Sequence, residues 1–253
     1  MATNSTVGAE TRRQRLLETL ATDGTIELEP AAAELGVSTM TVRRDLADLE
    51  ADGLLRRVRG GAVPSPRARS FAERRDTDAS AKSVIAEKAL DLVPRQGAVA
   101  FDASSSSGVL ISRIPGVQDL VLATNSAENF AVARRVEGAS PVLIGGEPEP
   151  RTDSFVGPMA YAAATSLHYA RFFSSAAGVD AEFGTSEVAP AESQLKLAFA
   201  SVSEETVLLI ASSKLGQRAV SRAIAWRDVS VIVTELEPTD PLLDPYRDLV
   251  EIL

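Results

Sequence analysis

Residues 38–63 read STMTVRRDLADLEADGLLRRVRGGAV, and this stretch governs how the first part of the chain folds. Ser38 is a good N-cap residue for a helix. After it, Val42, Leu46 and Leu49 recur at the spacing that places apolar side chains on one helical stripe. The stretch therefore predicts a helix that begins at Ser38 and buries this stripe.

The opposite face of the predicted helix carries residues suited to DNA. At about 100° per residue, Met40, Arg43 and Arg44 project away from the apolar stripe. Small, methyl-bearing and cationic side chains on such a face can meet base edges and phosphates. Asp48, four residues after Arg44, is expected to pair with it within the helix. The candidate DNA contacts of this helix are Ser38, Thr39, Met40, Thr41, Arg43 and Arg44.

Shorter patterns flank this helix on both sides. Upstream, leucines at helical spacing predict a helix over residues 13–21, and residues 30–35 predict a short second helix before Gly36. Two short helices, a tight turn and an exposed helix make a helix-turn-helix. Downstream, residues 54–63 read as two strands around a glycine turn, which is a wing that would lie along DNA phosphates. The candidate contacts of the wing are Arg56, Arg57 and Arg59.

The charge pattern around the wing supports DNA binding over a merely solvated surface. Residues 53–69 hold five arginines and no acidic residue. A solvated face usually mixes both signs, whereas a run of one sign beside a capped helix is typical of a nucleic-acid interface.

The motifs resemble a known family. The pattern LGVSxxTVRRDL at residues 35–46, followed by LLRRxRGGA at residues 54–62, is similar to the N-terminal domain of DeoR-family bacterial transcription regulators. The resemblance covers residues 12–63. The family commonly has a histidine before the two glycines, where this chain has Arg59, so a phosphate donor is kept and a titratable one is lost.

Composition restricts the remaining chemistry. The chain has 253 residues, no cysteine and a single histidine, His168, so disulfides, thiolate nucleophiles and multi-histidine metal sites are excluded. We expect no metal and no cofactor. No apolar run is long enough to cross a bilayer, and the N-terminus lacks the apolar segment of a signal peptide, so a cytoplasmic protein without a membrane partner is predicted.

The net charge of −9 is unevenly divided along the chain. Residues 1–70 hold ten basic and ten acidic residues, so all the excess acid lies in the second part. We therefore expect a winged helix-turn-helix domain at 1–63, a linker at 64–81 and an effector-sensing domain at 82–253. The family resemblance implies that Phe71 and Arg74 dock onto the sensing domain.

After residue 81, helical and strand patterns alternate. This alternation predicts an α/β domain with a mostly parallel sheet and helices on both faces. Expected helices are 82–92, 108–114, 126–136, 157–168 and 195–203, and expected strands are 98–101, 120–123, 141–144, 170–174, 207–210 and 229–233.

Ligands bind such sheets at the carboxyl ends of the strands, so residues just after each strand are candidates. Their hydroxyls, amides, one carboxylate and one cation would suit a phosphate and a polyol. The candidate effector contacts are Asp102, Ser104, Ser105, Ser106, Ser107, Thr124, Asn125, Ser126, Gly145, Gly146, Asp180 and Lys214.

Each candidate also has a simpler interpretation. The serines can be a helix cap, the residues at 124–126 an Asx turn, and the glycines an ordinary loop. For Arg218 and Arg222 we favour an exposed helical face over an anion site. For His168 we favour packing or hydrogen bonding at a helix end over a catalytic role.

The second part also resembles the DeoR-family sensor domain, which is similar in fold to sugar-phosphate isomerases. Residues 102–107 match the family's DxGTTT phosphate loop, 124–126 its TNS, 144–146 its IGG, 154–158 its SFVGP, 178–180 its GID and 212–214 the SSK of its DSSK. Three positions depart from the family. Ser104 replaces a glycine, Ala211 replaces the aspartate of DSSK, and Glu235 follows Thr234 where the family commonly has threonine followed by aspartate.

Three functions compete at this point. The leading hypothesis is a transcription regulator, expected to be a repressor and a homo-oligomer (dimer or tetramer), that binds double-stranded operator DNA and releases it when a phosphorylated sugar binds. The alternative is an isomerase-like enzyme with an appended DNA module, in which Asp180 is acid or base and Lys214 or Lys196 steadies an enediolate. A constitutive architectural DNA binder leaves the strand-end residues unexplained. The sparse carboxylates favour the regulator, which is not an enzyme.

Overall fold

The computed structural model describes residues 3–51, 55–64, 71–150 and 152–253. The chain divides into two compact units, Met1–Arg67 and Ala68–Leu253. Within the segment expected as a linker at 64–81, residues 71–76 and 79–81 lie in helices and belong to the second unit. None of the described helices is long and apolar enough to span a membrane.

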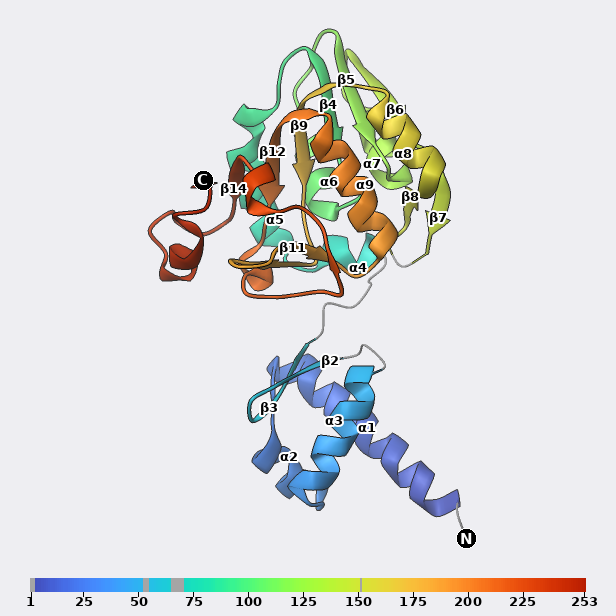
Figure 1. Ribbon diagram of the computed structural model, residues 1–253, viewed down its shortest axis with the longest axis vertical. Helices are drawn as coiled ribbons and strands as arrows, with labels where there is room; N and C mark the ends of the chain where they lie inside the picture. The colour runs from blue at the N-terminus through green and yellow to red at the C-terminus, as the bar shows by residue number, and fades with distance from the viewer. Residues whose placement is uncertain (1–2, 52–54, 65–70, 151) are drawn as a thin grey trace. The chain divides into compact units, whose positions relative to one another are not determined.

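The first unit is a winged helix-turn-helix (Figure 1). Its elements are α1 (Thr3–Asp23), β1 (Ile26–Glu27), α2 (Leu28–Leu35), α3 (Thr39–Ala51), β2 (Leu55–Val58) and β3 (Gly61–Pro64). Gly36 ends α2 in a left-handed conformation, and the Ser38 hydroxyl accepts a hydrogen bond from the Thr41 amide at 3.2 Å, as the N-cap prediction requires.

A small core of its own holds this unit together. The apolar stripe of α3, which consists of Val42, Leu46 and Leu49, is buried in one cluster with Leu16 and Leu20 of α1. Both sets of residues were expected from the sequence to be buried. The wing strand β3 pairs with both β2 and the short β1. Ile26 thus links the wing to the helical core.

The second unit is built on a seven-stranded sheet in the order β15-β14-β12-β9-β4-β5-β6, and every pairing in it is parallel. The strands are β4 (Gly97–Phe101), β5 (Leu120–Thr124), β6 (Ala139–Leu143), β9 (Tyr169–Ser174), β12 (Ser203–Leu209), β14 (Val231–Val233) and β15 (Glu251–Ile252). The α/β prediction with a parallel sheet is confirmed.

Helices cover both faces of this sheet (Figure 1). One face packs against α5 (Ala79–Ala89), α6 (Ser105–Ile111) and α7 (Ala127–Ala133), and the other against α8 (Gly157–Thr165) and α9 (Pro190–Ser201). Alternating strand residues separate the two layers, so Phe172 lies in one core and Phe173 in the other.

Several short elements of this unit were not expected from the sequence. They are α4 (Phe71–Asp76), the hairpin β7 (Glu147–Glu149) with β8 (Ser154–Val156), and the antiparallel sheet of β10 (Gly178–Asp180), β11 (Gly184–Glu187) and β13 (Ser221–Arg222). Short 3₁₀ turns are Leu90–Leu92, Ser212–Lys214, Trp226–Asp228 and Pro241–Tyr246. The exposed helical face expected for Arg218 and Arg222 is not formed, because Arg222 lies on β13 and Arg218 lies in the irregular stretch before it.

Candidate functional site

The exposed face of α3 carries the candidate DNA contacts. Ser38, Thr39, Arg43 and Arg44 are exposed, and Met40 keeps 69% of its surface open to solvent. An exposed methionine of that size on a polar helix is available for contact with a partner. Thr41 is half-buried on the flank.

Two acidic residues of α3 pair with arginines of α1 instead. Asp45 is buried and forms an ion pair with Arg12 at 2.6 Å. Asp48 lies 3.5 Å from Arg13, so the expected pair between Asp48 and Arg44 is wrong. Because α1 packs against this side of α3, it offers partners that lie far away in sequence. Arg43 and Arg44 make no ion pair with any residue that the structure describes.

The wing presents further cations beside this face. Arg57 and Arg59 are exposed, and Arg56 lies on β2 opposite Val63. Arg57 is held by Glu50, which accepts hydrogen bonds from its amide at 2.8 Å and from Nε at 2.6 Å. This contact ties the wing to the end of α3, and it partly neutralises Arg57.

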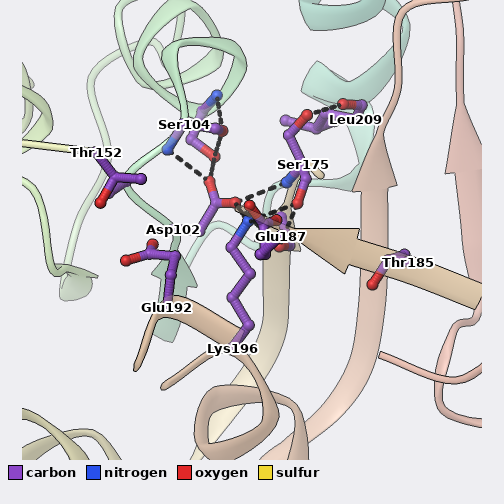
Figure 2. Close-up of polar contacts among 12 residues, drawn as sticks. Asp102, Ser104, Thr152, Ser175, Thr185, Glu187, Glu192, Lys196 and Leu209 are labelled. Atoms are coloured by element: carbon purple, nitrogen blue, oxygen red, sulfur yellow. Dashed lines mark hydrogen bonds and ion pairs between the residues drawn. The ribbon is translucent and has the colours of Figure 1, made fainter. Parts of the chain in front are cut away.

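In the second unit, Asp102 is the centre of a buried polar cluster at the carboxyl end of β4 (Figure 2). Its Oδ1 accepts hydrogen bonds from the Ser104 amide at 3.0 Å and the Ser107 hydroxyl at 2.7 Å. Its Oδ2 accepts from the Ser175 amide at 2.7 Å and lies 3.0 Å from Lys196 Nζ. Asp102 therefore orders the loops around it and has no free oxygen to offer a ligand.

Lys196 reaches into this cluster from α9 (Figure 2). Its Nζ donates to Glu187 at 2.5 Å and to the Ser175 carbonyl at 2.7 Å. Burial opposes the charge of Lys196, but the carboxylates of Asp102 and Glu187 raise its pKa above the usual range. Burial likewise opposes the charge of Asp102, yet the charge of Lys196 and the hydrogen bonds hold its pKa well below the usual range.

Lys214 is a second cation at the same edge of the sheet. Its Nζ donates to the Ser175 hydroxyl at 2.7 Å, and no carboxylate forms an ion pair with it among the described residues. Burial lowers the pKa of Lys214 to about 8, and the charges of Lys196 and Lys82 act in the same direction. An anion bound here would restore a favourable environment for the charged ammonium.

The serine run forms the start of α6, which begins three residues earlier than expected. Ser104 is the N-cap and accepts a hydrogen bond from the Ser107 amide at 3.1 Å. The Ser105 hydroxyl donates to the Arg74 carbonyl at 3.0 Å. The Ser106 hydroxyl has no hydrogen-bond partner within the part of the chain that the structure describes, so of the four serines it is the one left available to a ligand.

A second polar chain starts at the end of β5. The Asn125 amide donates to the Phe155 carbonyl at 3.1 Å and points toward Glu192 at 3.5 Å, while its buried Oδ1 has no partner among the described residues. Glu192 accepts a hydrogen bond from the Ser154 hydroxyl at 2.6 Å, and Ser154 lies 2.8 Å from the Thr152 hydroxyl. Burial raises the pKa of Glu192.

The neighbours of Asn125 have local roles. Thr124 is buried and accepts a hydrogen bond from the Ser126 amide at 3.3 Å, and Ser126 is the N-cap of α7, with its hydroxyl 3.2 Å from the Asn129 amide. The expected turn and cap at residues 124–126 are therefore present beside the cluster.

Other sequence candidates have different surroundings. Asp180 forms an ion pair with Arg218 at 2.8 Å, and both Arg218 and Arg222 lie over the ring of Phe183. Arg218 lowers the pKa of Asp180. In the described part of the chain, Asp180 makes no hydrogen bond to the Asp102 cluster.

The glycines and the histidine are explained by local structure. A Cβ on Gly146 would lie 2.4 Å from the Val156 carbonyl, so this glycine is required for packing against β8 and α8, whereas Gly145 is exposed with open space around it. His168 is exposed just after α8 and lies 3.2 Å from Glu204.

The departure at Glu235 has a structural role. Its carboxylate accepts hydrogen bonds from the Ser212 amide at 3.0 Å and from the Ser212 hydroxyl at 2.5 Å. Glu235 thus holds the turn that carries Lys214, even though Ala211 supplies no carboxylate.

The sequence patterns did not identify Ser175, Glu187 and Glu192 as members of the cluster. Ser175 directly follows β9, so the strand-end argument would have included it. Glu187 lies on a short polar strand, and Glu192 precedes Lys196 by one helical turn on α9. That i, i+4 spacing was the available signal.

Comparisons with known proteins agree with this architecture. Residues 12–66 match the model of the DeoR-like helix-turn-helix domain, and residues 77–236 match that of the DeoR C terminal sensor domain. The uncharacterized HTH-type transcriptional regulator YulB of Bacillus subtilis is 30% identical over 227 residues, which are 88% of this chain and 88% of that protein. The lactose phosphotransferase system repressor of Streptococcus mutans is 29% identical over 250 residues, 95% of this chain and 98% of that protein.

Among solved structures, ribose 5 phosphate isomerase A from Neisseria gonorrhoeae is similar with a TM-score of 0.39 and 19% identity, over 55% of this chain and 53% of that one. The two family models together match both units in their order along the chain. The chain therefore belongs to the DeoR family of transcription regulators.

Proposed function

We propose that this protein binds operator DNA through the exposed face of α3 and the wing, and releases it when a phosphorylated sugar occupies the Asp102 cluster. The observation that carries the proposal is the position of Lys214. It is a cation without a carboxylate partner among the described residues, and it is linked through Ser175 to Asp102, the residue that orders the serine run. Such a site favours an anion beside hydroxyl groups.

The ligand class follows from the groups left available. Lys214 and Ser106 would take the phosphate, and Asn125 with the backbone at Gly145 would take sugar hydroxyls. A relative named as repressor of a lactose phosphotransferase system supports a phosphorylated sugar and a repressor for this chain. Asp102, Ser104, Ser105 and Ser107 position these contacts, because their own hydrogen bonds are already made.

An isomerase activity is not favoured. Isomerisation needs a carboxylate or similar base free to move a proton at the substrate carbon. Asp102 is occupied by Lys196 and four hydrogen bonds, Asp180 by Arg218, and Glu192 by Ser154. These contacts favour a regulator that binds its ligand and leaves it chemically unchanged.

The proposal includes a homo-oligomer that acts in the bacterial cytoplasm. Paired helix-turn-helix domains read two half-sites of an operator, so two copies are needed for specific binding. Operator DNA lies in the cytoplasm, and the protein has to be there to regulate it.

The experiment is an anisotropy titration of the full chain with duplexes tiling the DNA upstream of its own gene, repeated with a panel of sugar phosphates. Sequence-specific binding that one sugar phosphate releases is the expected result. As a control, Ser106→Ala should retain DNA binding and lose most of the response to that compound. Specific binding that no sugar phosphate changes would contradict the proposed ligand class, and absence of specific binding would contradict the regulator itself.

A further inference from the structure

α4, the first described helix of the second unit, contacts the loops beside the Asp102 cluster. α4 begins four residues after the boundary between the units and is the first element of the second unit that the structure describes. The contacts of α4 therefore bear on how ligand binding reaches DNA.

Arg74 of α4 holds two separate loops at once. Its Nη1 donates to the Ala103 carbonyl at 2.9 Å, and its Nη2 donates to the Thr152 carbonyl. A planar guanidinium with two donors in a rigid fork fixes the distance between its two acceptors, which a lysine ammonium cannot do in the same way. The guanidinium also lies 5.5 Å from the centre of the Phe71 ring.

The loops hold α4 in return. The Ser105 hydroxyl donates to the Arg74 carbonyl at 3.0 Å, and Lys82 Nζ donates to the same carbonyl. Asp153 accepts a hydrogen bond from the Phe71 amide at 2.8 Å. The first residue and the middle of α4 are thus fastened to the loops that contain residues 103–105 and 152–153.

Each of these loops leads directly to a ligand-contact candidate. Ala103 and Ser105 flank Ser104 at the start of the serine run. Thr152 continues through Ser154 to Glu192, which lies 3.5 Å from the Asn125 amide. A ligand that drew the serine run and Asn125 together would change the separation of the two carbonyls that Arg74 bridges.

We infer that Arg74 couples the ligand site to DNA binding. Its guanidinium bridges the Ala103 and Thr152 carbonyls, so a change in the distance between these two loops shifts α4, and the shift of α4 alters DNA binding. This inference rests on the proposed function, because it needs a ligand in the cluster. In this inference Arg74 is a positioning residue, because its guanidinium donates to the Ala103 and Thr152 carbonyls. A residue that served only to anchor α4 would affect stability and leave the response to ligand intact.

The test compares full-length wild type with Arg74→Lys and with the control Arg75→Lys. The Arg74→Lys variant keeps the positive charge and loses the two-pronged contact. Arg75 lies on the same helix, is exposed and pairs only with its neighbour Asp76 at 3.1 Å among the described residues. Three quantities are measured for each protein: affinity for upstream DNA, affinity for the releasing sugar phosphate without DNA, and the ratio of DNA affinities with and without that sugar phosphate.

The expected result is a selective loss of coupling. Arg74→Lys should bind DNA and sugar phosphate within about 3-fold of wild type, while the ratio falls at least about 10-fold, which is within the usual range of coupling between two sites. Arg75→Lys should match wild type in all three quantities. A normal ratio in Arg74→Lys overturns the inference, and so does a loss of sugar-phosphate affinity itself, because Arg74 would then belong to the ligand site.

A second readout separates this inference from the proposed function. If no compound of a panel containing glucose 6-phosphate, fructose 1-phosphate and ribose 5-phosphate releases DNA from wild type, the proposed function fails. Hydrogen exchange with and without inorganic phosphate then decides the coupling. Changed protection of α4 in wild type, absent in Arg74→Lys, supports it, and unchanged protection in wild type overturns it.

Discussion

Arg43 and Arg59 represent two ways in which single residues can contribute to DNA binding. Arg43 lies on the exposed face of α3 and Arg59 at the turn of the wing. We propose that Arg43 contacts base edges and Arg59 contacts phosphates. We expect Arg43→Ala to weaken binding to the operator by about 1–3 kcal/mol and to leave nonspecific DNA little changed. Anisotropy titrations against operator and scrambled duplexes measure both.

Arg59→Ala serves as the matched comparison. A phosphate contact carries no sequence information, so this variant should weaken all duplexes alike and make the logarithmic salt dependence shallower by about one unit. An Arg43→Ala variant that behaved like Arg59→Ala would place Arg43 on phosphates.

Lys214 should make ligand binding depend on pH. Burial lowers its pKa to about 8, so its ammonium loses its proton as the pH rises through that value. Affinity for a phosphorylated ligand should therefore fall between about pH 7 and 9, and calorimetry across this range measures it. Lys214→Arg, which stays charged, should give a flat profile, and a wild-type profile equally flat would remove Lys214 from the phosphate site.

Lys214 should also make the free energy of unfolding depend on pH, in the opposite direction to the ligand affinity. The pKa of Lys214 is about 8 in the folded protein and has a reference value of 10.5. Between these values the unfolded chain binds more protons than the folded one, so the contribution of Lys214 to the free energy of unfolding rises with pH across this window. Below about pH 8 the cost of burying the charged ammonium is present in full.

At the scale of elements, the wing depends on a close approach between two strands. A Cβ on Gly61 would lie 1.7 Å from the Ile26 carbonyl oxygen. The backbones of Gly61 and Ile26 cannot move apart without breaking the β1–β3 pairing. We expect Gly61→Ala to lower the free energy of unfolding of the first unit by about 1–3 kcal/mol and to weaken binding to every duplex. Urea unfolding followed by circular dichroism measures the loss.

Gly8→Ala is the control for this variant. Gly8 lies in α1 of the same unit with open space where a Cβ would stand, so alanine there should leave stability unchanged or slightly raised. Equal stability of Gly61→Ala and wild type would mean that the wing adjusts by losing its contact with β1.

Elements with strong periodicity were predicted from the sequence, and short polar ones were not. The apolar stripe of α3 and the buried strands β4, β5 and β9 come from patterns that solvent exclusion imposes over several residues. β10, β11 and β13 have two to four residues each, and β13 pairs with a strand far away along the chain, so no local pattern indicates them. The pair of Asp48 with Arg13 is the same case, since the two side chains are 35 positions apart.

At the scale of the whole molecule, the two units have separate cores. Leu16, Val42 and Leu46 belong to a cluster confined to the first unit, and the two layers of the parallel sheet belong to the second. Under the proposed function, a ligand in the second unit therefore has to act on a unit that folds around a core of its own.

Coupling of this kind is reciprocal. If the sugar phosphate lowers DNA affinity by a given factor, saturating operator DNA must lower sugar-phosphate affinity by the same factor. Calorimetric titration of the ligand into free protein and into the protein–operator complex should give matching factors. A ligand affinity unaffected by DNA would mean that the release seen in the DNA assay is not caused by binding of the sugar phosphate to this protein.

Patterns among neighbouring residues were enough to establish the two-part organisation, the helix-turn-helix with its exposed arginines, the parallel α/β class and the polar residues that follow the strands. Periodicity, capping and charge act over short stretches of chain and are therefore visible in the sequence. Only the tertiary structure decides which polar groups remain available to a ligand. In the fold both carboxylate oxygens of Asp102 accept hydrogen bonds, and Asp180 pairs with Arg218. Glu187 pairs with Lys196, and Arg74 bridges two loops. The physical reason is that buried polar groups must find partners, and those partners come from strands and loops distant in sequence.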